Sequence, residues 1–172
     1  MGIMKKKGAR DFTVGRIVAG AAVILFSATV VETSSSGITT NVVHARAAFS
    51  EPVDIKLKVG NAPQVIHVAQ AADTVMQQLV FGPGGQSGWH SHPGPAIVLV
   101  KSGELTLYSG DDPNCEGHAY GVGQAFIDSG QGHVHLARNE GSVDAEVWVT
   151  YLDVPPGTPA RIDATDPGNC QF

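Results

Sequence analysis

The chain has 172 residues, with 11 Lys and Arg, 16 Asp and Glu, and a formal net charge of −5 at neutral pH. This length allows one compact domain of ordinary size beside a long N-terminal segment. The negative balance argues against a nucleic-acid-binding surface, because such surfaces gather Lys and Arg into basic patches.

Residues 1–16 are basic, and an apolar run follows at residues 17–31. A basic start before an apolar run of this length is typical of a secretory signal peptide or a short membrane anchor. Small residues make the run only mildly hydrophobic, which favours a signal peptide. Cleavage fits best after the small-x-small sequence at 45–47, or at the closer and weaker site at 34–36. We therefore predict an exported protein that is extracellular, periplasmic or attached to the cell envelope, with membrane contact only if cleavage fails.

Residues 32–48 are polar and rich in Ser and Thr, and they show no apolar periodicity. Such a composition predicts a linker or a removed segment. We thus assign residues 1–47 to a signal peptide or anchor with its linker, and residues 48–172 to one domain. That domain keeps five basic and 14 acidic residues, a formal net charge of −9. It would repel nucleic acid and anionic lipid.

From Glu51 onward the apolar residues form short runs, each bounded by Gly, Pro, Asn or Asp. Ile55, Leu57 and Val59 alternate with lysines, and similar runs follow at 65–68, 75–81, 96–100, 104–108, 125–127 and 143–149. No long helical period is present after residue 48. Many short strands with regular turns predict an all-β sandwich or barrel.

Cys115 and Cys170 are the only cysteines, and both lie in turn-rich segments. In an exported protein, an even pair in loops predicts a disulfide that ties the C-terminal tail to a loop. The alternative is that Cys115 and His118 form a Cys-x-x-His metal site. A single such pair without a second cluster is weak evidence for a metal site, so the disulfide is the preferred interpretation.

The densest chemistry lies in residues 84–103, around the pair His90 and His92. In a strand, side chains at positions i and i+2 leave the same face. His133 and His135 form a second pair of this kind. Neutral imidazole is the commonest protein ligand for several transition metals. One such pair arises easily by chance, but two pairs on β-rich segments predict a metal site.

These pairs and their spacing resemble the first conserved motif of the cupins. That motif runs from a Gly through two His and a Glu to a second Gly. Gly84, His90, His92 and Gly103 fall on this pattern, whereas Ala96 stands where the glutamate is usual.

The second cupin motif has a similar counterpart downstream. Gly132, His135 and Asn139 match it, Gly130 stands where Pro is usual, and Gln124 stands at the leading Gly. The resemblance implies a small single-domain jelly-roll β-barrel of the cupin type-2 kind, preceded here by the N-terminal signal or anchor segment. Cupins also commonly pair through an edge strand, so a homodimer could form.

By this resemblance, His90, His92 and His135 would hold a divalent Fe, Mn, Ni, Cu or Zn ion. His133 could be an additional ligand or lie behind the ligands. Four further residues are candidates for lining the pocket: Gln86, Trp89, Gln124 and Tyr108. Because three neutral ligands leave the ion its full charge, the site should favour an anionic or chelating small molecule.

Two classes of function fit these features. One is an exported metal-binding cupin that binds a small ligand or substrate. The alternative is a metal-dependent dioxygenase-type enzyme that acts on a small organic substrate. Glu104 and Glu140, the carboxylates beside the two motifs, are not placed near a ligand histidine by the sequence pattern, and this leaves enzymatic activity uncertain.

Overall fold

The computed structural model describes residues 1–2, 34–60 and 65–172, and every helix or strand assigned within these ranges is a β-strand. The prediction of an all-β fold is confirmed. The apolar run at 17–31 lies outside the described residues. Within the described part of the chain, no helix is long and apolar enough to cross a bilayer.

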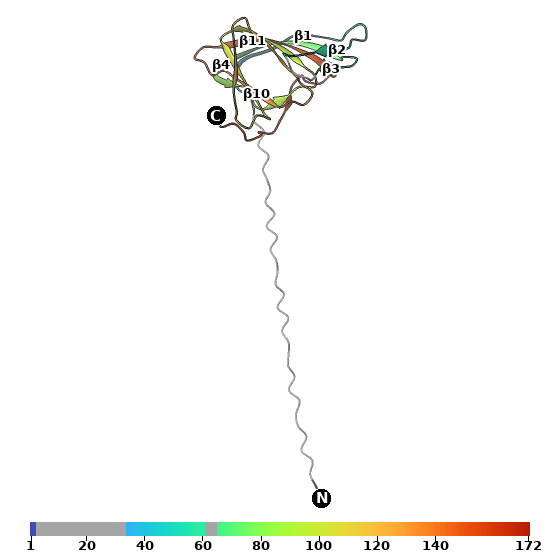
Figure 1. Cartoon of the computed structure of the whole chain (residues 1–172), viewed down its shortest axis with the longest axis vertical. Coiled ribbons are helices and arrows are strands. Elements are labelled where there is room, and N and C mark those ends of the chain that lie inside the picture. Colours follow the sequence, from blue (N-terminus) through green and yellow to red (C-terminus); the bar gives the residue numbers. More distant parts are fainter. Residues whose placement is uncertain (3–33, 61–64) are drawn as a thin grey trace.

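Ten strands form one antiparallel sheet that curls into a nearly closed barrel (Figure 1). Its main path runs in the order β12 (Ile162–Asp163), β5 (His90–Ser91), β10 (His135–Arg138), β4 (Asp73–Gln86), β11 (Ala145–Val154), β6 (Ala96–Ser102) and β9 (Ala125–Asp128). Three more strands branch from it: β1 (Ser36–Ala47) pairs with β4, β7 (Glu104–Ser109) with β10, and β8 (His118–Gly121) with β7.

Alternating residues of these strands fill the barrel. Along β11, alternate side chains point inward and are buried, namely Ala145, Val147, Val149 and Tyr151. Phe81 on β4 and Leu105 on β7 pack into the same core. This two-residue period is what a sheet with one buried face requires, and it explains why the strands were visible in the sequence.

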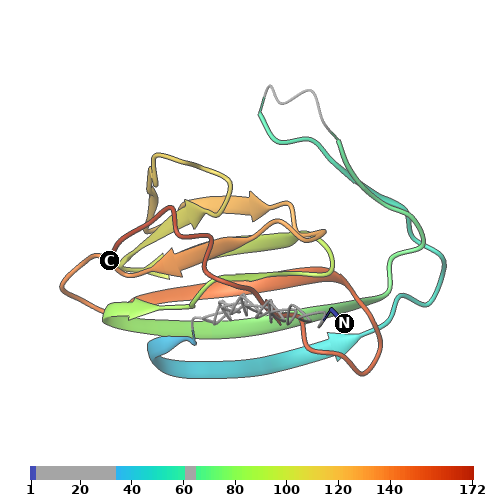
Figure 2. The ribbon, with the colours of Figure 1, turned by 90° about the horizontal axis from the view of Figure 1, so that it is seen from below.

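A separate hairpin of β2 (Ile55–Leu57) and β3 (Ile66–Val68) projects from the barrel as an arm (Figure 2). The predicted runs at 55–59 and 65–68 each contain one of these strands. Val68 of β3 is buried, and Ile66 lines a cavity together with Asp128 and His133, so the arm begins against the side of the barrel that carries His133.

The structure corrects the interpretation of residues 32–48 as a linker. Residues 36–47 form strand β1, which pairs with β4 almost from end to end. Most β1 side chains are exposed, and only Ile38 packs against the core, so the segment lacks the apolar alternation of an internal strand. An edge strand of this kind is held mainly by its backbone ladder, which leaves little signal in the sequence.

Arg46, near the end of β1, forms hydrogen bonds to the start of β4 and to the segment that follows β11. Its Nε donates to Asp73 Oδ2 at 2.6 Å, and its two terminal nitrogens donate to the carbonyls of Thr158 and Pro155, each at 2.6 Å. Strand β1 is thus attached both to β4 and to the segment that follows β11.

The predicted disulfide is confirmed: Cys115 and Cys170 are bonded across a sequence separation of 55 residues. Closing a loop of this length stabilises the fold by about 4 kcal/mol on the chain-entropy model. Cys170 is buried against Trp89 and Leu136, so the bond holds the C-terminal segment on the barrel. The sulfur of Cys115 is therefore not available to a Cys-x-x-His site, and His118 is exposed on β8.

Candidate metal centre

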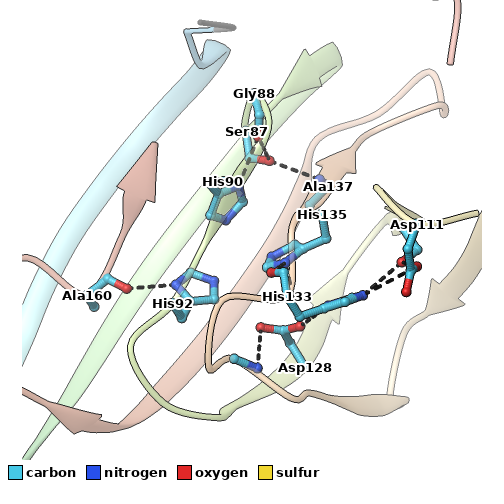
Figure 3. Close-up of polar contacts among 12 residues, drawn as sticks. Ser87, Gly88, His90, His92, Asp111, Asp128, His133, His135, Ala137 and Ala160 are labelled. Carbon is cyan, nitrogen blue, oxygen red and sulfur yellow. Dashed lines mark hydrogen bonds and ion pairs between the residues drawn. The ribbon is translucent and has the colours of Figure 1, made fainter. Parts of the chain in front are cut away.

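Strands β5 and β10 bring the two histidine pairs together. His90 and His135 are directly paired across these antiparallel strands, and His92 follows β5. The ring centroids are 4.3 Å apart for His90 and His135, 4.9 Å for His90 and His92, and 5.1 Å for His92 and His135. Each side chain offers a nitrogen within 4.8 Å of the other two (Figure 3). We call these residues the three-His group.

The outer nitrogen of each ring in the three-His group faces a backbone carbonyl. Nδ1 of His90 lies 2.9 Å from the oxygen of Gly88, Nδ1 of His92 lies 2.7 Å from that of Ala160, and Nδ1 of His135 lies 3.3 Å from that of His133. A carbonyl accepts a hydrogen bond, so each Nδ1 carries the proton and Nε2 keeps its lone pair for a metal. Histidine ligands are commonly oriented in this way.

Burial keeps the three-His group uncharged. It lowers the pKa of His90 well below the ordinary value, and the nearby His135, Arg161 and His92 lower it further because they disfavour an additional positive charge there. Burial also lowers the pKa of His92, and it lowers the pKa of His135 to about 4. Neutral imidazoles need not release a proton to bind a metal ion at physiological pH.

The stability of the metal-free protein should therefore fall as the pH falls. Between about pH 6.5, where a histidine in the unfolded chain titrates, and about pH 4, the unfolded state binds more protons than the folded state. For His135 alone the expected loss is about 3 kcal/mol. Urea unfolding from pH 7.5 to pH 4.5 would measure it, with His135→Gln as the control. A variant whose pH dependence equals that of the wild type would contradict this result.

Asp128 adds a buried carboxylate that the sequence motifs did not reveal. It pairs directly with Ala96 across β9 and β6, so both side chains leave the same inward face of the sheet. Its side chain is 2% exposed, and Oδ1 lies 3.5 Å from Nδ1 of His135. The carboxylate of Asp128 therefore places a negative charge beside the three-His group. Asp128 is the cross-strand partner of Ala96, the position where the cupin motif has a glutamate. The sequence signal was a polar residue two places after inward-facing Phe126.

His133 lies behind the three-His group. Its Nδ1 donates to Asp128 Oδ1 at 3.0 Å (Figure 3). Its Nε2 lies 2.8 Å from Ser109 Oγ, which donates in turn to Asp111. The hydrogen bond to Asp128, opposed by burial, raises the pKa of His133. Asp128, His133 and His135 also form a second cluster of donor atoms within 4.8 Å. Of the two roles predicted for His133, the position behind the ligands fits this geometry.

Two small cavities meet the three-His group. The inner cavity has a volume of about 50 Å³. It is lined by all three histidines, by Asp128 and by apolar core residues. The second cavity has a volume of about 70 Å³ and is lined by His90, His92, Tyr151 and Arg161, among others. Small molecules of a few atoms could reach the histidines there.

The four predicted pocket residues lie outside both cavities. Trp89 is buried in a separate cluster with Leu136 and Cys170, because it points away from the side of β5 that carries His90. Tyr108 donates to Glu140, Gln124 accepts from the backbone of Gly121 in an exposed turn, and Gln86 is half-buried at the end of β4. Proximity in sequence to the motifs was a poor guide to which side chains face inward.

The structure is thus a small all-β barrel with three neutral histidines beside small cavities, a candidate metal site. The family model described as the cupin domain matches residues 78–155, which include both histidine pairs. Residues 78–155 of this chain are therefore similar to the cupin domain. No curated protein matches the chain.

Several solved structures are similar to this chain at low identity. The cupin domain of an XRE family transcriptional regulator from Enterobacter cloacae is 21% identical, with 48% of this chain and 82% of that chain covered and a TM-score of 0.39. A Klebsiella pneumoniae protein with a double-stranded beta-helix domain is 22% identical, with 69% and 88% covered and a TM-score of 0.43. An oxalate oxidase is 24% identical, with 52% and 45% covered and a TM-score of 0.43. The match thus spans less than half of the oxalate oxidase chain.

Proposed function

We propose that this protein is an exported cupin that holds one divalent transition metal on the three-His group and binds a small anionic or chelating ligand at the open positions of the ion. The observation that carries this proposal is the set of three buried, neutral imidazoles whose Nδ1 atoms all face carbonyls. Iron, manganese, nickel, copper and zinc all accept such ligands.

Export is part of the proposal. It is supported by the basic and apolar pattern of residues 1–31, and the disulfide is compatible with an oxidising compartment.

The metal content of the full-length protein tests the proposal. The protein would be purified without chelators or a histidine tag and compared with His135→Ala and with His118→Ala, which removes an exposed histidine on β8. We expect near-stoichiometric metal in the wild type and in His118→Ala, and none in His135→Ala. A wild type without metal after growth in metal-supplemented medium would refute the proposal, as would equal metal in His135→Ala.

An oxygenase-type enzyme is the second candidate. It is favoured by the Asp128–His133 pair, which lies against His135 and could carry a proton close to a bound ligand. Oxygen uptake by the metal-loaded protein in the presence of small carboxylic acids would support this candidate.

A further inference from the structure

Arg161 lies beside the three-His group although it is far from both motifs in sequence. It directly precedes β12, whose Ile162 and Asp163 pair with Ser91 and His90 of β5. The residue before it, Ala160, provides the carbonyl that faces His92 Nδ1. The backbone pairing of β12 therefore fixes the start of the Arg161 side chain next to the histidine pair.

The guanidinium of Arg161 is only partly satisfied. Its Nε donates to Asp163 Oδ1 at 2.6 Å. Its Nη2 is buried and has no hydrogen-bond partner among the described residues. A buried donor of a charged group that lacks a partner is costly, so it indicates a place for an acceptor.

The cavity that Arg161 lines offers no protein anion to fill that place. The same cavity is bounded by His90, His92 and Tyr151, by apolar residues, and by four uncharged polar residues: Ser35, Asn41, Gln77 and Ser87. No Asp or Glu lines it among the described residues, because Asp128 lines the inner cavity and Asp163 is exposed. The cavity therefore carries a net positive charge before any metal is added.

We propose that Arg161 binds the carboxylate of a small ligand whose second oxygen donor reaches the three-His group. This inference rests on the proposed function and names the class of ligand, a small carboxylic acid with a neighbouring hydroxyl or carboxyl group. Guanidinium recognises carboxylate through parallel N–H donors, and two fixed points of contact orient a ligand of this size. The cavity is small, with a volume of about 70 Å³, and so suits a compact ligand of this kind.

Glycolate binding to the full-length, Co²⁺-loaded protein tests this role. Absorption of bound Co²⁺ reports both loading with metal and a change in its ligands. Glycolate is the probe, and glycolamide is its neutral counterpart. We expect Arg161→Gln to weaken glycolate binding by about tenfold to a hundredfold, since one charge-assisted contact is lost. Arg161→Lys should recover part of the affinity, and binding of Co²⁺ and of glycolamide should change little.

Asp163→Asn is the matched control, because it removes the ion pair of Arg161 outside the cavity and leaves the guanidinium in place. It should bind glycolate like the wild type. If Asp163→Asn and Arg161→Gln lose glycolate binding equally, with equal falls in melting temperature, Arg161 is merely structural and the inference is overturned.

The two proposals fail in different ways. A wild type that binds no Co²⁺ refutes the metal site and this inference with it. A wild type that binds Co²⁺ but gives no response to glycolate, or one equal to that of Arg161→Gln, overturns the role of Arg161 and leaves the metal site standing.

Discussion

A chain that begins at Ala48 is expected to melt about 10 °C or more below one that begins at Ser34. The shorter chain lacks β1, which pairs with β4 from Thr74 to Gln86, and it lacks the Arg46 contacts to Asp73 and the segment after β11. Each backbone hydrogen bond contributes about 1 kcal/mol, so the ladder amounts to a large share of the 5–15 kcal/mol that holds a typical domain. Calorimetry of the two purified proteins would measure the difference.

Arg46→Ala in the longer chain is the control. It removes the side-chain contacts and keeps the backbone ladder, so its melting temperature should fall by less than that of the shorter chain. The shorter chain should also aggregate more readily, because the loss of β1 exposes an edge of β4. Equal melting temperatures for the two chains would show that β1 is dispensable. That result would favour processing after residue 47 over processing near residues 34–36.

Asp128→Asn is expected to lower the metal affinity of the three-His group by roughly tenfold to a hundredfold. The substitution keeps the size of the side chain and removes its charge beside Nδ1 of His135. Without that carboxylate the imidazole is a weaker donor, and the charge of the ion is less well balanced. Competition titrations with Co²⁺ and a chromophoric chelator would give the affinities.

Ala96→Glu distinguishes this electrostatic role from a structural one. Ala96 and Asp128 share a face, so a glutamate at position 96 returns a carboxylate to the same interior. A protein that carries both Asp128→Asn and Ala96→Glu should therefore regain much of the metal affinity that Asp128→Asn loses. His133→Gln, which removes the other partner of Asp128, should lower the affinity by less than Asp128→Asn does. An unchanged affinity in Asp128→Asn would rule out the carboxylate as a contributor.

The parts of the site that were predictable depend on local patterns. The His90–His92 spacing is short-range, so their common face could be read directly from the sequence, and the two cysteines could pair only with each other. Asp128, Arg161 and strand β1 depend on which distant segments lie side by side. The register between β6 and β9 puts Asp128 opposite Ala96, and the pairing of β12 with β5 puts Arg161 beside His92. No periodicity within either segment encodes these contacts.

The same reasoning explains why residues 36–47 were interpreted as a linker although they form strand β1. Apolar alternation marks a strand only when one of its faces is buried, and β1 is exposed along most of its length. Trp89 illustrates the reverse case, since a large side chain next to a motif histidine was expected in the pocket and instead fills a second core.

Two parts of the candidate site, the carbonyl of Ala160 and the guanidinium of Arg161, come from the C-terminal segment of the chain. A polypeptide is made from its N-terminus, so β5 and β10 exist before Ala160, Arg161 and Cys170 have emerged. The carbonyl that orients His92 and the guanidinium in the second cavity arrive only when this late segment docks on β5, and the disulfide then fastens it. The three-His group therefore lacks one of its orienting carbonyls and the neighbouring guanidinium until the C-terminal segment has docked and the disulfide has formed.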